Sequence, residues 1–82
     1  MQNQAKPTAA ELLISWQLIW TRLLNGKPGE LKQALNSHAK LFPAGNQAEA
    51  RIRAERTVAQ YQNEPAQVRN IINRTKHTLR SA

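Results

Sequence analysis

The chain has 82 residues, which suffices for one small domain with a modest hydrophobic core. It contains no cysteine, so disulfide bonds and thiolate metal sites are excluded, and a reducing compartment is expected. Twelve basic and five acidic side chains give a net charge of +7, which favours an anionic partner such as nucleic acid, anionic lipid or an acidic protein.

Residues 1–7 are polar and lack the charged and apolar segments of a secretory signal, so we expect them to be disordered and the chain to be cytoplasmic. A first helix is predicted between Thr8 and Gly26. Thr8 and Glu11 have the spacing of a capping box, and Asn25-Gly26 is a typical helix end. The helix is too short and too polar to span a membrane.

The apolar residues of this helix are divided between two sides. Seven fall on one broad arc, which we expect to face the core: Leu12, Leu13, Trp16, Ile19, Trp20, Leu23 and Leu24. Ile14 and Leu18 stand on the otherwise polar side, one turn apart. A helix that is apolar on a second side usually lies at an interface, so Ile14 and Leu18 are predicted to contact a second copy or another protein.

A second helix is predicted from Pro28 to about Phe42, and the short connection before it predicts an antiparallel hairpin. The inner face of this helix holds Leu31, Ala34, Leu35, His38, Leu41 and Phe42. His38 could act as a buried base or a pH switch, but no second catalytic residue type stands at a matching spacing. We therefore expect a partly buried imidazole that bonds to a backbone carbonyl or to a neighbouring helix.

The segment Pro43-Ala44-Gly45 predicts a turn, followed by a capping box of Asn46 and Glu49 and a third helix to about Asn63. The small and apolar residues of this helix form two stripes: Ala48, Ile52 and Ala59 in one, and Ala50, Ala54, Val58 and Tyr61 in the other. The pattern suits a helix packed between neighbours, and equally a helix stabilised by the high propensity of alanine.

Glu64-Pro65 predicts a break or sharp kink and a fourth helix from Pro65 to about Arg80. The apolar face of this helix consists of Val68, Ile71, Ile72, Thr75 and Leu79. We expect one all-α domain over residues 1–82, a small bundle of three to four helices with short connections.

A basic stripe marks the helix from Pro65 to about Arg80. Arg69, Asn73, Lys76 and Arg80 recur at spacings of four, three and four, and Arg74 continues around the polar side with Asn70 and His77. There is no acidic residue from Pro65 to Ala82. Cations at helical pitch with interspersed amides are typical of phosphate contacts, although a solvated helix of a basic protein can show the same pattern.

The helix from about 47 to 63 offers a second set of candidates. Arg53 and Arg56 would face outward on a recognition helix if the chain between about 28 and 63 were a helix-turn-helix. Glu49 can pair with Arg53, and Arg51 with Glu55, both across four residues. We therefore rank these arginines below the basic stripe.

The sequence favours a small non-enzymatic accessory protein that binds nucleic acid, directly or within a larger nucleoprotein complex. Duplex or structured RNA contacts are preferred to base stacking, because the large aromatic residues are assigned to the core. No catalytic triad, cofactor site or metal site is predicted, and a membrane partner is disfavoured because the basic helix lacks Trp and Phe anchors. The alternative is a protein–protein adaptor or inhibitor that uses Ile14 and Leu18 and matches its basic surface to an acidic protein.

Overall fold

The computed structural model describes residues 6–81, which form four α-helices and one short 3₁₀ turn. The elements are α1 (Ala9–Asn25), α2 (Pro28–Lys40), η1 (Ala44–Asn46), α3 (Gln47–Tyr61) and α4 (Pro65–Ser81). The predicted all-α fold with short connections is confirmed. The disorder expected for residues 1–7 falls largely on residues 1–5, which lie outside the described residues; Lys6 and Pro7 precede α1 without regular secondary structure.

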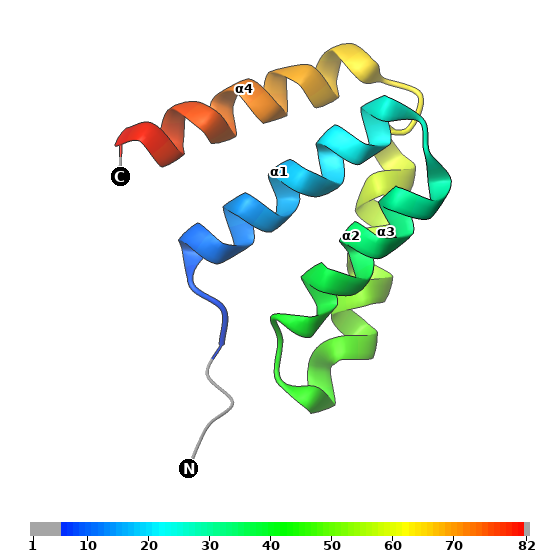
Figure 1. The fold of residues 1–82 in the computed structure, drawn as a ribbon, viewed down its shortest axis with the longest axis vertical. Helices are drawn as coiled ribbons and strands as arrows, with labels where there is room; N and C mark the ends of the chain where they lie inside the picture. The colour runs from blue at the N-terminus through cyan, green and yellow to red at the C-terminus, as the bar shows by residue number, and fades with distance from the viewer. Residues whose placement is uncertain (1–5, 82) are drawn as a thin grey trace.

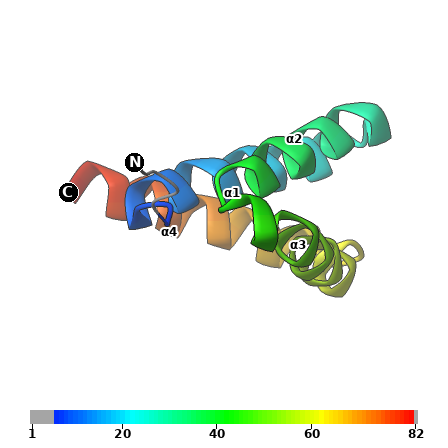
Figure 2. The same cartoon turned by 90° about the horizontal axis from the view of Figure 1, so that it is seen from below.

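The four helices form two layers. Helix α1 packs against both α2 and α4, and α3 packs mainly against α2 and makes few contacts with α4. Figure 1 shows α4 returning alongside α1 in the opposite direction, and Figure 2 shows the α1–α2 pair lying over the α4–α3 pair. None of the helices within residues 6–81 is long and apolar enough to cross a membrane.

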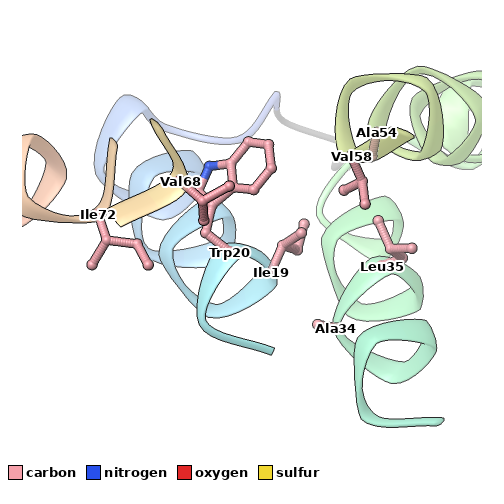
Figure 3. Close-up of a cluster of buried hydrophobic side chains, with 8 residues drawn as sticks. All are labelled: Ile19, Trp20, Ala34, Leu35, Ala54, Val58, Val68 and Ile72. Atoms are coloured by element: carbon pink, nitrogen blue, oxygen red, sulfur yellow. The ribbon is translucent and has the colours of Figure 1, made fainter. Parts of the chain in front are cut away.

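Each of the four helices contributes two buried side chains to one core cluster (Figure 3). The cluster consists of Ile19, Trp20, Ala34, Leu35, Ala54, Val58, Val68 and Ile72. All eight lie on faces that the sequence periodicity predicts as apolar. Burial of a large apolar side chain contributes about 1.5–3 kcal/mol, so this cluster is the main source of stability that holds the helices together.

The predicted ends of α1 are confirmed. The backbone N–H of Glu11 donates to Thr8 Oγ1 at 3.1 Å, and the N–H of Thr8 donates to Glu11 Oε1 at 2.8 Å. At the other end Gly26 adopts φ +70°, a left-handed conformation that costs glycine little because it has no Cβ. These local signals set the length of the helix that carries the centre of the core.

The connection between α2 and α3 differs from the prediction. Helix α2 ends at Lys40 instead of Phe42, because the following Pro43 disfavours the helical conformation for the residue before it. The capping box predicted for Asn46 and Glu49 is wrong. The N–H of Asn46 already donates to Pro43 O at 2.8 Å within η1, which runs directly into α3, and the Asn46 side chain makes no cap bond.

Helix α3 ends at Tyr61, two residues before the predicted end. The N–H of Glu64 donates to Tyr61 O at 2.9 Å in a tight turn, and Pro65 then begins α4, as predicted. The stripe of Ala50, Ala54 and Val58 is buried, whereas the stripe of Ala48, Ile52 and Ala59 is exposed. Helix α3 is therefore covered on one face only and is not packed between two neighbours.

Candidate nucleic-acid interface

Helix α4 has one face turned to α1 and one turned to solvent. Val68, Ile72 and Thr75 are buried, and Ile71 and Leu79 are partly buried. The Thr75 hydroxyl donates to the Ile71 carbonyl at 2.9 Å, so its burial leaves no unpaired polar group on that side chain. This inner face attaches α4 to α1, its main contact in the fold.

The outer face of α4 carries the predicted basic stripe, which we define as Arg69, Asn73, Lys76 and Arg80. All four side chains are exposed, as are Asn70, Arg74 and His77 beside them. With a rise of 1.5 Å per residue, the stripe extends over about 16 Å, a length along which duplex DNA carries about ten phosphate charges. One helix face is therefore long enough to meet several phosphates.

The cations of α4 are not neutralised by ion pairs within residues 6–81. In that range the ion pairs are Arg22–Glu30 (3.0 Å), Lys27–Glu30 (3.8 Å), Arg51–Glu55 (3.2 Å) and Arg53–Glu49, and none involves α4. Four of the twelve basic side chains of the chain lie on α4, which has no acidic residue of its own. The acidic residue before α4, Glu64, accepts a hydrogen bond from Gln67 at 2.6 Å.

The arginines of α3 are engaged as predicted. Arg51 pairs with Glu55 and also donates to Asn36 of α2, and Arg53 pairs with Glu49. Arg56 is exposed and makes no ion pair within the described part of the chain. Helix α3 thus presents less uncompensated positive charge than α4, which agrees with the lower rank given to Arg53 and Arg56 as candidate nucleic-acid contacts.

Arg53 and Arg74 belong to different parts of the surface from the basic stripe. Arg53 lines a pocket formed by α1, α2 and α3, to which α4 contributes no side chain. Arg74 borders a shallow hollow of about 250 Å³ between α1 and α4, together with Leu13 and Ile71. The structure therefore groups Arg69, Asn73, Lys76 and Arg80 on one face and leaves the other candidates apart.

Ile14 and Leu18 are exposed, as expected from their place on the otherwise polar side of α1. Ile14 is 59% exposed and Leu18 is 41% exposed. Ile52 of α3, which the sequence pattern placed in a stripe of small residues, is a third exposed apolar side chain at 48%. A partner for Ile14 and Leu18 stays a prediction.

His38 lies at the centre of an aromatic group that the sequence did not bring together. The imidazole is 3% exposed, and its Nδ1 lies 2.8 Å from Ser15 Oγ of α1. Its ring centroid is 4.8 Å from that of Trp16 and 5.5 Å from that of Phe42. Burial lowers the pKa of His38 below its ordinary value of 6.5, because the charged imidazolium loses hydration. The expected hydrogen bond to a neighbouring helix is confirmed, although the ring is more deeply buried than expected.

Trp16 and Trp20 differ in burial, although the sequence predicts both as core residues. Trp20 is buried at 4% exposure, whereas Trp16 is partly buried and lines the pocket that contains His38. The Trp16 contact with α2 could not be predicted from the periodicity of α1, because it depends on where α2 crosses α1.

Comparison of the chain with known protein families, with curated proteins and with solved structures finds no match.

Proposed function

We propose that this protein is a small, cytoplasmic, non-enzymatic accessory protein that binds the phosphate backbone of nucleic acid through the basic stripe of α4. The observation that carries the proposal is the exposure of Arg69, Lys76 and Arg80 on one helix face without ion pairs in residues 6–81. Each phosphate contact releases condensed counterions, which gives affinity without a demand for a base sequence. Asn73, between these cations, can donate a further hydrogen bond to a phosphate oxygen.

Duplex nucleic acid or structured RNA fits this surface better than an unpaired strand. Binding of single strands usually relies on exposed aromatic rings on which bases stack. Trp20 is buried, and Tyr61 packs its ring edge-on against Trp20 at 5.5 Å, so neither ring is displayed beside the basic stripe. The proposed contacts are therefore to the backbone of a folded nucleic acid, directly or within a nucleoprotein complex.

A second candidate function rests on a separate observation. Ile14 and Leu18 expose apolar surface on α1, and isolated apolar side chains one turn apart suit the packing of another helix. In this function the protein is an adaptor or inhibitor, and its positive charge complements an acidic protein surface. The two functions differ in how binding to generic nucleic acid depends on salt.

The test is a fluorescence-anisotropy titration of the full chain against a labelled duplex DNA and an RNA hairpin of about 20 base pairs, repeated over a series of salt concentrations. The double variant Lys76→Ala/Arg80→Ala removes two charges from the basic stripe. The matched control, Lys32→Ala/Lys40→Ala, removes two exposed charges from α2. The proposal expects the first variant to bind nucleic acid more weakly and with a shallower salt dependence than the wild type. The affinity and salt dependence of the control should change little.

Two results would count against the proposal. Equal losses in the two variants would mean that net charge alone, and not the face of α4, attracts the nucleic acid. Absence of binding by the wild-type chain at low salt would remove nucleic-acid binding altogether and favour the adaptor.

A further inference from the structure

A pocket of about 460 Å³ lies between the N-terminal half of α1, the end of α2 and the first turns of α3. In Figure 1 the end of α2 and the start of α3 lie at the bottom of the view, on the side of α1 that faces away from α4. The volume is within the range of about 300–1,000 Å³ that is typical of small-molecule sites. Its apolar lining includes Leu12, Trp16, Phe42, Ala50 and Ala54.

The aromatic wall of the pocket is held in place by the core. The Trp16 ring stacks on the buried Trp20 ring with centroids 5.2 Å apart and an interplanar angle of 24°. Phe42 is positioned by the turn after α2, where its carbonyl accepts a hydrogen bond from Gln47 Nε2 at 3.0 Å. Since Trp20 cannot move without disturbing the core, Trp16 is held in position at the pocket before any ligand arrives.

His38 supplies a polar group inside this apolar lining. Its Nδ1 lies 2.8 Å from Ser15 Oγ, and this hydrogen bond fixes the position of the imidazole. His38 lines the pocket together with Trp16 and Phe42, so the lining includes one polar ring among apolar side chains.

The charged side chains at the pocket are Lys6, Glu49 and Arg53. Glu49 and Arg53 pair with each other, and Lys6 makes no ion pair within residues 6–81. Two cations against one carboxylate leave a local excess of one positive charge. The polar edge of the pocket therefore complements a molecule with a single negative charge.

We propose that this pocket binds a small monoanion that consists of a planar apolar body and one carboxylate. The body lies against Trp16 and Phe42, and the carboxylate lies towards Lys6 and Arg53. The site is separate from the basic stripe, because no residue of α4 lines the pocket. Ligand binding in the pocket and nucleic-acid binding by the basic stripe can therefore be tested independently of each other.

The test is an NMR titration of the ¹⁵N-labelled full chain with 2-naphthoate and, separately, with its neutral isostere 2-naphthamide. We expect naphthoate to shift the resonances of Leu12, Ala50, Ala54 and the Trp16 indole N–H, with a Kd of about 10 µM to 1 mM for a ligand of this size. Naphthamide should cause the same shifts with an affinity about two- to fivefold lower, because an ion pair at an exposed rim contributes little.

A matched pair of variants tests the charge selection. Arg53→Gln removes a cation from the pocket edge at a side chain that is 75% exposed, and Arg56→Gln removes an exposed arginine of the same helix outside the pocket. Arg53→Gln should lower naphthoate affinity to the level of naphthamide or below and leave naphthamide affinity unchanged. Arg56→Gln should leave both affinities unchanged.

Three results would overturn the proposal. The first is the absence of shifts at the pocket residues at millimolar naphthoate. The second is an equal affinity for naphthoate and naphthamide in both the wild-type chain and Arg53→Gln. The third is shifts centred on the exposed Ile14, Leu18 and Ile52, which would show adsorption to apolar surface instead of entry into the pocket.

Discussion

Ser15 on α1 and His38 on α2 are joined by a hydrogen bond of 2.8 Å between Ser15 Oγ and His38 Nδ1. The bond crosses the interface of the two helices at a depth where the imidazole is almost fully buried. It satisfies one ring nitrogen and holds the ring between Trp16 and Phe42. The local structure of the pocket and part of its stability therefore depend on one polar pair in an apolar setting.

The pH dependence of stability should follow His38. Burial lowers its pKa in the folded chain, so in the unfolded chain, with an ordinary pKa near 6.5, the imidazole takes up a proton at higher pH than in the folded chain. The contribution of the neutral imidazole is complete above about pH 6.5 and is lost as the pH falls towards the folded-state pKa. The melting temperature, followed by circular dichroism between about pH 7.5 and 5, should therefore decrease with falling pH.

His38→Gln should flatten this pH profile, because the titrating group is gone. His77→Gln, which changes an exposed histidine of α4, is the control and should retain the wild-type profile. A His38→Gln profile as steep as that of the wild type would assign the pH dependence to other groups.

Ser15→Ala should destabilise the fold although Ser15 is a small residue on the polar side of α1. The substitution leaves Nδ1 of the buried His38 without its partner, which costs about 1–3 kcal/mol. Urea unfolding should report this loss as a lower midpoint with an unchanged slope. Ser37→Ala, at an exposed serine of α2, should change the midpoint little. Equal midpoints for the two variants would mean that the bond contributes nothing.

Trp20→Ala should destabilise the protein strongly. Trp20 is 4% exposed and belongs to the core cluster, and truncation of a core tryptophan costs about 3–5 kcal/mol, a large fraction of the stability of a domain of this size. Thermal unfolding should show a reduced melting temperature or no cooperative transition. A variant that retains its melting temperature and loses nucleic-acid binding would show that Trp20 is a ligand platform and not a core residue.

Leu18→Glu should dissociate a self-associated form of the protein. Leu18 and Ile14 are exposed on α1, and a carboxylate placed in an apolar interface carries a large desolvation cost. Sedimentation at micromolar concentration should show the wild type heavier than one chain and the variant as a monomer. Ile52→Glu is the control, since it places the same charge at an exposed apolar position of α3. A folded wild type that sediments as a monomer would contradict self-association.

Single alanine substitutions of Arg69, Lys76 and Arg80 should each lower the magnitude of the log–log salt slope by about 0.7–0.9. Affinity should fall equally for unrelated sequences, because phosphate contacts carry no base information. The three side chains are exposed, so the melting temperature should change little. Arg53→Ala should have a smaller effect, since Glu49 already pairs with Arg53. A triple Arg69/Lys76/Arg80→Ala variant with the wild-type slope would exclude the stripe as the binding surface.

Features that lie within one helix could be predicted from the sequence. The capping box of Thr8 and Glu11, the left-handed Gly26 and the start of α4 at Pro65 depend on neighbours a few residues away. The exposed basic stripe is of the same kind, because its residues share one helix and helical pitch alone aligns them. The predicted Asn46 cap is wrong although it is also a local feature, because the backbone N–H of Asn46 donates to Pro43 O within η1 and the Asn46 side chain makes no cap bond.

The pocket, in contrast, was decided by tertiary structure. It combines Trp16 of α1 with Phe42 after α2 and Arg53 of α3, and the bond that orders it joins Ser15 to a histidine that is distant in the sequence. Periodicity determines which side of a helix is apolar, but not which helix covers that side or how completely. Side-chain sizes at the contacts decide how helices cross. Between α1, α2 and α3, apolar side chains that belong to predicted core faces, such as Trp16 and Phe42, therefore border an open pocket instead of a filled core.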